Sequence, residues 1–251
     1  MSSKPFHFKQ FTVHQDQAAM KVGTDGVLIG AWTPLQLPGA LPPYRMLDIG
    51  SGSGLIALML AQRSSAEQID AVEINAAAYE QATFNFEASP WNDRLFCYHA
   101  SFQEFAEEFA DDPPYDLICC NPPFYRGGTS TLDPARNQAR IPNELPFEQL
   151  IVGVTLLLAS DGLFSTILPA SETPDFIKLA QRHGLHLNRM TRVKGRPETS
   201  VKRCLLQFSF RELPAGRQES KIVREELIIE TERHQYTPEY QNLTKEFYLK
   251  M

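Results

Sequence analysis

Short apolar runs and helical patterns alternate along the chain from Arg45 onward. The runs are rich in β-forming side chains and predict strands over residues 45–49, 68–73, 95–99 and 115–120, the last of them buried. Between the first three runs, apolar residues recur at helical spacing over 54–63 and 75–88, and Asn75 is placed to cap the second helix. Strands that alternate with helices are typical of a parallel sheet built from βα units.

The later part of the chain continues this pattern and adds a hairpin. A helix is predicted over 147–159, followed by a turn at 160–162, a strand over 163–168 and a helix near 174–182 that ends at Gly184. Residues 185–193 and 201–210 alternate in polarity around the Gly195-Arg196-Pro197 turn and predict an antiparallel hairpin at the sheet edge. The fold class is therefore α/β, with a seven-stranded, mostly parallel sheet and helices on both faces.

Two stretches lack any periodicity. Residues 34–43 hold four prolines and separate an N-terminal segment from the α/β core, which predicts a boundary between residues 1–43 and 44–251. Residues 125–142 contain Gly127-Gly128 and three arginines. Because long structureless stretches are uncommon inside compact domains, we expect this one to be a functional loop.

Composition excludes several classes of protein. The chain has 251 residues, 43% of them hydrophobic and 22% charged, with a net charge of −6, which disfavours disorder. Its longest apolar run, over 150–159, is short of the roughly 20 residues that span a membrane. No signal peptide is visible, so a cytoplasmic protein is expected. The four cysteines form no CxxC pair and the histidines are scattered, which favours reduced thiols and no metal site.

Charge is unevenly spread along the chain. Residues 61–120 hold 12 acids against two bases, whereas residues 178–203 hold eight bases against one acid, Glu198. An acidic protein with such a basic stretch can present a cationic face to a polyanion. The alternative is that these are solvated charges on strands and turns.

A glycine-rich loop follows the first strand of the core. Its sequence, Asp48-Ile49-Gly50-Ser51-Gly52-Ser53-Gly54, lets the backbone turn tightly and approach a ligand. A dinucleotide-binding fold would need its third glycine at position 55, which is Leu, and this disfavours an oxidoreductase. Glu73 lies 23 residues past Gly50 at the end of the next strand, where a carboxylate can accept hydrogen bonds from ribose hydroxyls. The D-x-G-x-G-x-G pattern resembles the nucleoside-binding loop of class I S-adenosylmethionine-dependent methyltransferases.

The second chemical motif, Asn121-Pro122-Pro123-Phe124, directly follows the strand over 115–120. The carboxyl end of a strand is the ligand-binding edge of an open α/β sheet. Since proline has no N–H, the Asn121 side-chain oxygen and a proline carbonyl can both accept hydrogen bonds from one planar NH2 group. Phe124 offers a face for a stacked base. This arrangement fits methyl transfer to a weakly nucleophilic nitrogen, with Asn121, Pro122 and Phe124 as the catalytic residues.

Together the two motifs resemble the [NDS]PP[FYW] branch of class I methyltransferases. The targets of that branch are adenine N6, cytosine N4, guanine N2 or a glutamine nitrogen, and Phe124 favours a nucleobase because glutamine-modifying members usually carry Tyr. Residues 8–15 and 20–28 are similar to the N-terminal signature of the bacterial methyltransferases that modify N6 of adenine 37 in valine tRNA. Residues 243–249 are similar to the tail of that family.

This resemblance implies S-adenosylmethionine as cofactor, tRNA as partner and a Rossmann-like class I fold. It implies that Lys21, Thr24 and Asp25 close over the methionine end of the cofactor, so that residues 1–43 cover the site and 44–251 form the methyltransferase domain. Many relatives hold the cofactor adenine with an Asp after the third strand, where this chain has Ser101. The implied cofactor-binding residues are thus Lys21, Thr24, Asp25, Asp48, Gly50, Gly52, Gly54, Glu73, Ser101 and Asn121.

An adenine inside a folded anticodon loop must leave its stack to reach Asn121, and loop bases are the easiest to extrude. The expected phosphate contacts are basic side chains of the long loop and of the basic stretch: Arg126, Arg136, Arg140, Lys194 and Arg196. Affinity for RNA should then fall with salt.

Two other functions fit parts of the pattern. One is a methyltransferase for guanine N2 in RNA or for a release-factor glutamine. The other is a non-catalytic RNA-binding or chaperone protein that retains the cofactor fold, although the intact Asp48, Gly50, Glu73 and Asn121 argue against it. No residue pattern specifies an oligomeric state.

Overall fold

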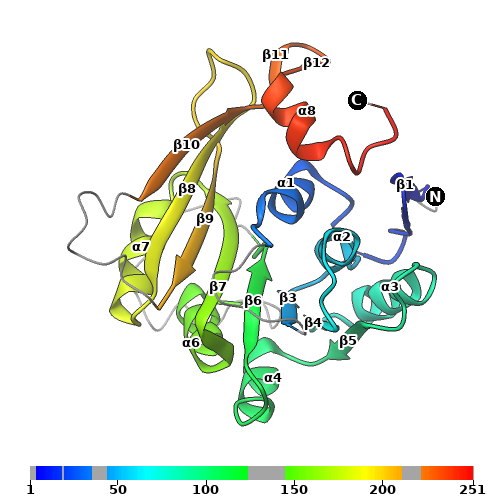
Figure 1. Ribbon diagram of the computed structural model, residues 1–251, viewed down its shortest axis with the longest axis vertical. Coiled ribbons are helices and arrows are strands. Elements are labelled where there is room, and N and C mark those ends of the chain that lie inside the picture. Colours follow the sequence, from blue (N-terminus) through cyan, green and yellow to red (C-terminus); the bar gives the residue numbers. More distant parts are fainter. Residues whose placement is uncertain (1–3, 19, 36–43, 124–144, 211–221, 251) are drawn as a thin grey trace.

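An eight-stranded sheet forms the centre of the computed structural model, which describes residues 4–18, 20–35, 44–123, 145–210 and 222–250. The strand order is β10-β8-β9-β7-β6-β3-β4-β5 (Figure 1). β9 is antiparallel to β7 and β8, and the other neighbours are parallel. The strands are β3 (Arg45–Ile49), β4 (Gln68–Glu73), β5 (Leu95–His99), β6 (Tyr115–Cys120), β7 (Leu158–Pro169), β8 (His186–Lys194), β9 (Arg203–Ser209) and β10 (Val223–Ile228). The predicted bounds of β3 to β6 are confirmed.

The sheet has one strand more than the seven predicted. β10 pairs in parallel with β8, so the β8–β9 hairpin does not lie at the edge. Leu227 is the buried apolar residue of β10, and two acids on this strand pair with bases of β8 at 2.8 and 3.2 Å, Glu225 with Arg189 and Glu226 with Lys194. Because cross-strand ion pairs contribute to this pairing, apolar alternation did not predict it.

β7 also begins earlier than predicted. Helix α6 (Phe147–Leu157) passes directly into β7 at Leu158, and the predicted turn at 160–162 lies inside the strand. Tyr115 pairs with Leu158 but Leu117 pairs with Leu163, so the additional residues form an irregularity in the ladder. A Cβ on Gly162 would lie 2.8 Å from Leu158 Cδ1. The Asp161-Gly162 sequence therefore marks a tight bulge instead of a chain reversal.

Helices cover both faces of the sheet (Figure 1). On one face lie α1 (Thr24–Trp32), α2 (Leu55–Arg63) and α3 (Ala76–Glu87), and on the other α4 (Phe102–Glu108), α6 and α7 (Thr173–Arg182). Each face buries its own apolar cluster: α1 and α2 contribute to one, and α4, α6 and α7 to the other. Gly184, with φ of +81°, follows α7 as predicted for a left-handed stop. Among the described residues, no helix has the length and apolar character that crossing a membrane requires.

The N-terminal segment is built into the core. α1 is buried from Gly26 to Trp32, and two of its glycines face α2. A Cβ on Gly26 would lie 3.0 Å from Leu55 Cδ2, and one on Gly30 would lie 2.7 Å from Met59 Sδ. Since 26 faces 55 and 30 faces 59, α1 and α2 lie close together and run in the same direction. The N-termini of both helices therefore lie at the same edge of the sheet.

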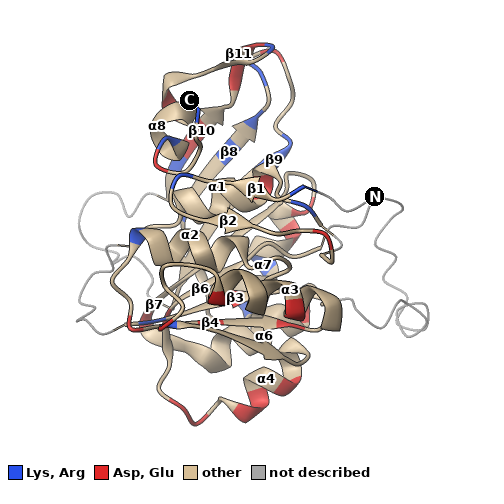
Figure 2. Ribbon diagram, turned by 90° about the vertical axis from the view of Figure 1, so that its right-hand side faces the viewer, with Lys and Arg blue, Asp and Glu red and all other residues tan. Residues whose placement is uncertain are grey.

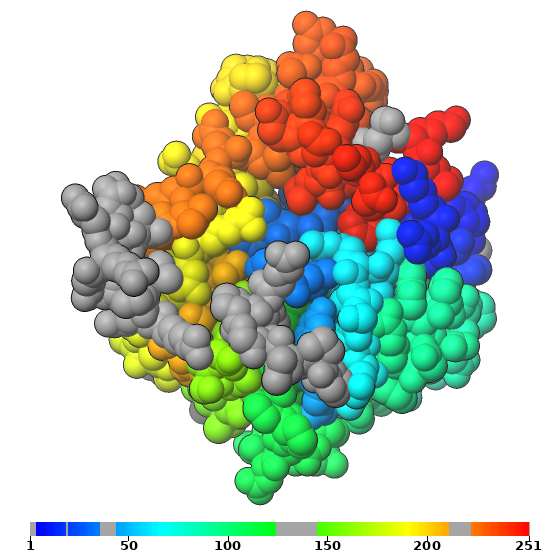
Figure 3. All heavy atoms as spheres, viewed as in Figure 1, coloured from blue at the N-terminus to red at the C-terminus, as the bar shows by residue number. Residues whose placement is uncertain are grey.

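The two ends of the chain pack on each other. The hairpin of β1 (Phe6–His7) and β2 (Thr12–Val13) contacts the residues that follow α8 (Pro238–Thr244), and the terminal segments touch in Figure 3. Phe8 forms an isolated bridge with Tyr248, and the Lys9 N–H donates to Phe247 O at 2.8 Å. A short pair, β11 (Glu230–Glu232) and β12 (Gln235–Tyr236), links β10 to α8. The N-terminal motif at residues 8–15 and the C-terminal motif at residues 243–249 are therefore in contact with each other.

Candidate functional site

Three predicted site residues meet where neighbouring strands end. β3 lies between β4 and β6, and Ile49 pairs with both Val72 and Cys120. Gly50 and Asn121 follow these paired residues, and Glu73 follows Val72 at the end of β4. From β3 the chain runs to β4 and β5 on one side and returns to β6 on the other. Ligands bind at such a topological switch point in open α/β sheets.

The glycine loop combines left-handed backbone with open space. Gly50, Gly52 and Gly54 have φ values of +70°, +56° and +78°. A Cβ on Gly54 would lie 2.4 Å from Phe86 Cε1, so packing against α3 requires glycine there. At Gly50 and Gly52, no atom of the described residues other than the immediate chain neighbours lies within 4 Å of a Cβ position. The first two glycines therefore border space that a ligand can occupy.

Glu73 is held by the backbone at both carboxylate oxygens. Its Oε2 accepts from the Gly52 N–H and its Oε1 from the Asn75 N–H, each at 2.9 Å. Each oxygen keeps a further lone pair that can accept from a hydroxyl. The next residue, Ile74, is 40% exposed and offers an apolar surface beside this carboxylate. The sequence motifs do not indicate Ile74; the signal that marks it is an apolar residue between a strand-terminal acid and a helix cap.

Asp48 lies completely buried beneath the loop. Its Oδ2 accepts from the Ala57 N–H at 3.2 Å, and its Oδ1 has no hydrogen-bond partner among the described residues. Burial raises the pKa of Asp48 from 3.8 to about 7; the Ala57 N–H lowers this pKa, and the charge of Glu73 raises it. The Asp48 carboxyl therefore changes charge near neutral pH and supports the start of α2.

Asn121 presents an unused acceptor at the same edge. Its Oδ1 is buried and has no hydrogen-bond partner within the described part of the chain, while Pro122 beside it is buried. Leaving such an acceptor unpaired costs about 1–3 kcal/mol. A ligand donor at this oxygen would recover that cost. Four predicted residues lie outside the described residues: Phe124, Arg126, Arg136 and Arg140.

The start of α1 also lies at this edge. Gly26 packs against Leu55, the first residue of α2, which places Thr24 and Asp25 near the glycine loop. Asp25 Oδ2 accepts from Arg203 Nε at 2.8 Å, where β9 begins. Lys21 and Thr24 are exposed. The Asp25–Arg203 pair joins α1 to the sheet, a contact between residues 178 positions apart that sequence spacing does not indicate.

Ser101 has a structural role of its own. It caps α4: its hydroxyl accepts from the Glu104 N–H at 3.2 Å and donates to Glu104 Oε2 at 2.7 Å. This capping box stabilises the helix start and accounts for a serine at this position without a ligand. Contact of Ser101 with a cofactor adenine stays a prediction.

The basic stretch is partly neutralised in the folded chain. Lys194 lies 3.2 Å from Glu226, and Arg196 lies 3.7 Å from Glu230. These acids belong to β10 and β11, outside the 178–203 window, so the window overstates the local charge. Arg192 and Lys202 are exposed, and no ion pair holds them among the residues that the structure describes. Figure 2 shows Lys and Arg along β8, with Asp and Glu on α3 and α4.

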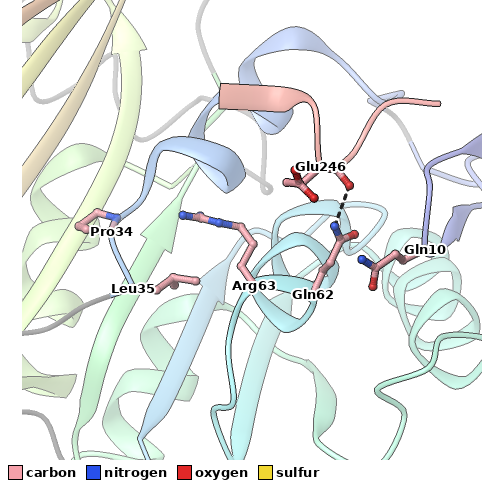
Figure 4. A pocket seen from close by; sticks show the side chains of 6 residues that line it. All are labelled: Gln10, Pro34, Leu35, Gln62, Arg63 and Glu246. Atoms are coloured by element: carbon pink, nitrogen blue, oxygen red, sulfur yellow. Dashed lines mark hydrogen bonds between the residues drawn. The ribbon is translucent and has the colours of Figure 1, made fainter. Parts of the chain in front are cut away.

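A separate hollow of about 590 Å³ lies at the other end of α2 (Figure 4). Gln62 and Arg63, the last residues of that helix, line it, and Gln62 Nε2 donates to Glu246 O at 2.9 Å. The remaining lining residues are Gln10, Pro34, Leu35 and Glu246. None of the predicted site residues lines it, so this hollow is not the glycine-loop site. In the described ranges, no cluster of three or more His, Cys, Asp or Glu could hold a metal ion.

Comparison with known proteins defines the class. The methyltransferase small domain family matches residues 36–138, which include the glycine loop and Asn121. The structure is similar to an O-methyltransferase predicted in Agrobacterium tumefaciens, with a TM-score of 0.63 and 19% identity, covering 89% of this chain and 96% of that one. It also resembles P. horikoshii TYW2 in complex with MeSAdo, with a TM-score of 0.54, 13% identity and coverage of 82% and 70%. The chain therefore has the Rossmann-like class I methyltransferase fold.

Full-length relatives define the family within that class. The tRNA1(Val) (adenine(37)-N6)-methyltransferase of Flavobacterium johnsoniae is 53% identical over 98% of this chain and 100% of its own length. The protein of the same name from Christiangramia forsetii is 50% identical over the whole of both chains. This chain belongs to the tRNA1(Val) (adenine(37)-N6)-methyltransferase family, which confirms the resemblance noted in its sequence.

Proposed function

We propose that this protein transfers a methyl group from S-adenosylmethionine to N6 of adenine 37 in valine tRNA, in the cytoplasm. Family membership supports the reaction and the substrate. The observation that carries the proposal is the buried Oδ1 of Asn121, which has no hydrogen-bond partner among the described residues and lies beside the open glycine loop. This acceptor matches a donor such as the exocyclic amine of adenine.

The residues around the loop fit the cofactor. Space beside Gly50 and Gly52 would admit the nucleoside, Glu73 would accept from its ribose hydroxyls, and Ile74 would contact its base. Thr24 and Asp25 would lie at the methionine end. When bound, S-adenosylmethionine supplies an electrophilic methyl group on a positively charged sulfur.

Asn121 and Pro122 would then activate the amine. The amine lone pair is delocalised into the adenine ring, which makes the nitrogen a poor nucleophile. Asn121 Oδ1 and a proline carbonyl would each accept a hydrogen bond from one N–H of the amine. These two hydrogen bonds would orient the nitrogen lone pair toward the methyl group. The site thus acts by positioning and by electrostatics, without a covalent enzyme intermediate. A strong base is not required, because the proton becomes acidic once the nitrogen is alkylated.

The tRNA backbone would lie over the carboxyl edge of β8 and the start of β9. Arg192 and Lys202 would be the strongest phosphate contacts here, because they are exposed and have no ion-pair partner among the described residues. Lys194 and Arg196 would contribute less, since Glu226 and Glu230 neutralise part of their charge. The three arginines of the long loop, Arg126, Arg136 and Arg140, remain proposed contacts.

Methyl transfer from labelled S-adenosylmethionine into unmodified tRNA, followed by nucleoside mass spectrometry, tests the proposal. We expect N6-methyladenosine from valine tRNA and a fall in kcat of about 100-fold or more in Asn121→Ala. Binding of S-adenosylhomocysteine, measured by calorimetry, should survive this substitution. Asn92→Ala, in the exposed turn before β5, is the matched control.

Each of the other outcomes contradicts a different part of the proposed function. A labelled guanosine would overturn the base assignment and keep the cofactor. No label in RNA with intact cofactor binding would favour a protein glutamine as acceptor, and no cofactor binding would favour a non-catalytic RNA-binding protein.

A further inference from the structure

One buried amide on α3 contacts two separate parts of the backbone. Asn85 is 1% exposed, and its Nδ2 donates to Ser53 O in the glycine loop and to His14 O in the N-terminal segment, each at 2.8 Å. Its Oδ1 accepts from the His14 N–H at 2.9 Å. Both N–H bonds and the carbonyl are therefore used, a set that no other side chain of this size supplies.

Neighbouring residues of α3 support the same two parts. Phe86 fills the space beside Gly54, with its Cε1 2.4 Å from the Cβ position of that glycine. One helical turn before Asn85, Gln81 Oε1 accepts from the Gln17 N–H at 3.1 Å. α3 thus holds residues 14–17 through two amides and supports the glycine loop from below. Asn85 is the side chain that bonds to both.

We propose that Asn85 is a positioning residue that couples the shape of the glycine loop to the placement of the N-terminal segment, an inference that rests on the proposed cofactor site. The segment continues from residue 17 to Lys21 and Asp25, the residues expected over the methionine end of the cofactor. A ligand that orders the glycine loop would also order the N-terminal segment, because Asn85 bonds to Ser53 in the loop and to His14 in the segment. Loss of the amide leaves three backbone groups without this partner, the buried Ser53 carbonyl and the partly buried N–H and carbonyl of His14.

Asn85→Asp tests this role with little change in shape. The carboxylate keeps the acceptor for the His14 N–H but loses both donors and faces two carbonyl oxygens. In the full chain, we expect the Kd for S-adenosylhomocysteine to rise by about tenfold or more, as for loss of a buried hydrogen bond. The KM for S-adenosylmethionine should rise more than kcat falls. A purely structural role would instead lower Tm and leave this KM unchanged at temperatures well below it.

Hydrogen exchange measures the coupling itself. In the wild type, S-adenosylhomocysteine should slow amide exchange in residues 51–54 and also in residues 14–17; in Asn85→Asp, the effect on 14–17 should disappear at saturating ligand. Gln81→Met is the matched control, because it removes a bond to the same segment without touching the loop. It should keep the Kd within about threefold, because the Gln81 bond to the Gln17 N–H does not reach the glycine loop.

Four results would overturn the inference. An unchanged Kd in Asn85→Asp, or an equal loss in Gln81→Met, would refute the positioning role while leaving the cofactor site intact. Failure of the wild type to bind S-adenosylhomocysteine would refute the cofactor site and the coupling with it. If Asn85→Asp does not fold, His14→Pro removes the N–H from the other end of the link, and unchanged ligand protection of residues 15–17 in that variant would equally refute the coupling.

Discussion

Alanine at two neighbouring glycines should separate folding from ligand binding. Gly52 and Gly54 both have positive φ, so a Cβ at either costs about 1–2 kcal/mol in backbone energy. At Gly54 the Cβ would also lie 2.4 Å from Cε1 of buried Phe86, and overpacking adds about 1–3 kcal/mol. Gly54→Ala should therefore lower the free energy of unfolding by about 2–5 kcal/mol, and Gly52→Ala by about 1–2 kcal/mol.

The loss of affinity for S-adenosylhomocysteine should be larger for Gly52→Ala than for Gly54→Ala. The Cβ of Gly52→Ala meets no described atom and projects into the space assigned to the nucleoside. An overlap worth about 1–3 kcal/mol raises the Kd for S-adenosylhomocysteine by about 5- to 150-fold. Urea denaturation gives the free energy of unfolding, and isothermal titration calorimetry gives the Kd.

A rescue variant checks the packing argument. Phe86→Leu removes the ring that the Cβ of Gly54→Ala would overlap, so the double variant should be more stable than the sum of the single effects predicts. Wild-type affinity in Gly52→Ala would refute the placement of the ligand. Equal destabilisation by the two alanines would refute the role of Phe86.

Two further predictions concern charge. Because the pKa of Asp48 is raised from 3.8 to about 7, its contribution to stability is present below pH 4 and is lost as pH rises to 7. Relative to the wild type, Asp48→Asn should therefore gain up to about 4 kcal/mol in free energy of unfolding between pH 4 and 8, and a difference independent of pH would contradict this. Arg192→Glu with Lys202→Glu should weaken tRNA binding and reduce the slope of log K against log salt by about one or more, measured by filter binding. Lys178→Glu with Arg182→Glu, at two exposed bases of α7, is the charge-matched control, and an equal effect there would refute a specific contact.

The sequence predicted the buried centre of the fold well. β3, β4 and β6 are parallel strands that are buried over most of their length, so each is a mainly apolar run with clear bounds, whereas β5 at the sheet edge is only partly buried. The glycine loop and Asn121 could be assigned to the ligand edge for the same reason, because a strand end fixes the position of the residue after it. The glycine loop, Glu73 and Asn121 lie close together because β4, β3 and β6 are neighbours in the sheet.

Features that depend on distant partners could not be predicted in this way. β10 is polar and pairs with β8 through Glu225 and Glu226, which lie more than 30 residues from their partners. The same acids neutralise bases that a local window counts as free. No sequence pattern indicates the role of Asn85, because a buried amide inside a helix is recognised only from the two backbone segments that it contacts in the folded chain.

Contact between the two ends of the chain also sets the order in which the protein can be completed on the ribosome. Lys9 Nζ donates to Lys245 O across 236 residues, and Phe8 is covered by Tyr248. At about 5–20 residues per second, translation separates these partners by roughly 12–50 s. During that time the N-terminal hairpin exists without the tail that covers it. Packing of the tail on the N-terminal hairpin is therefore among the last events of synthesis, and the hairpin of an unfinished chain lacks this cover.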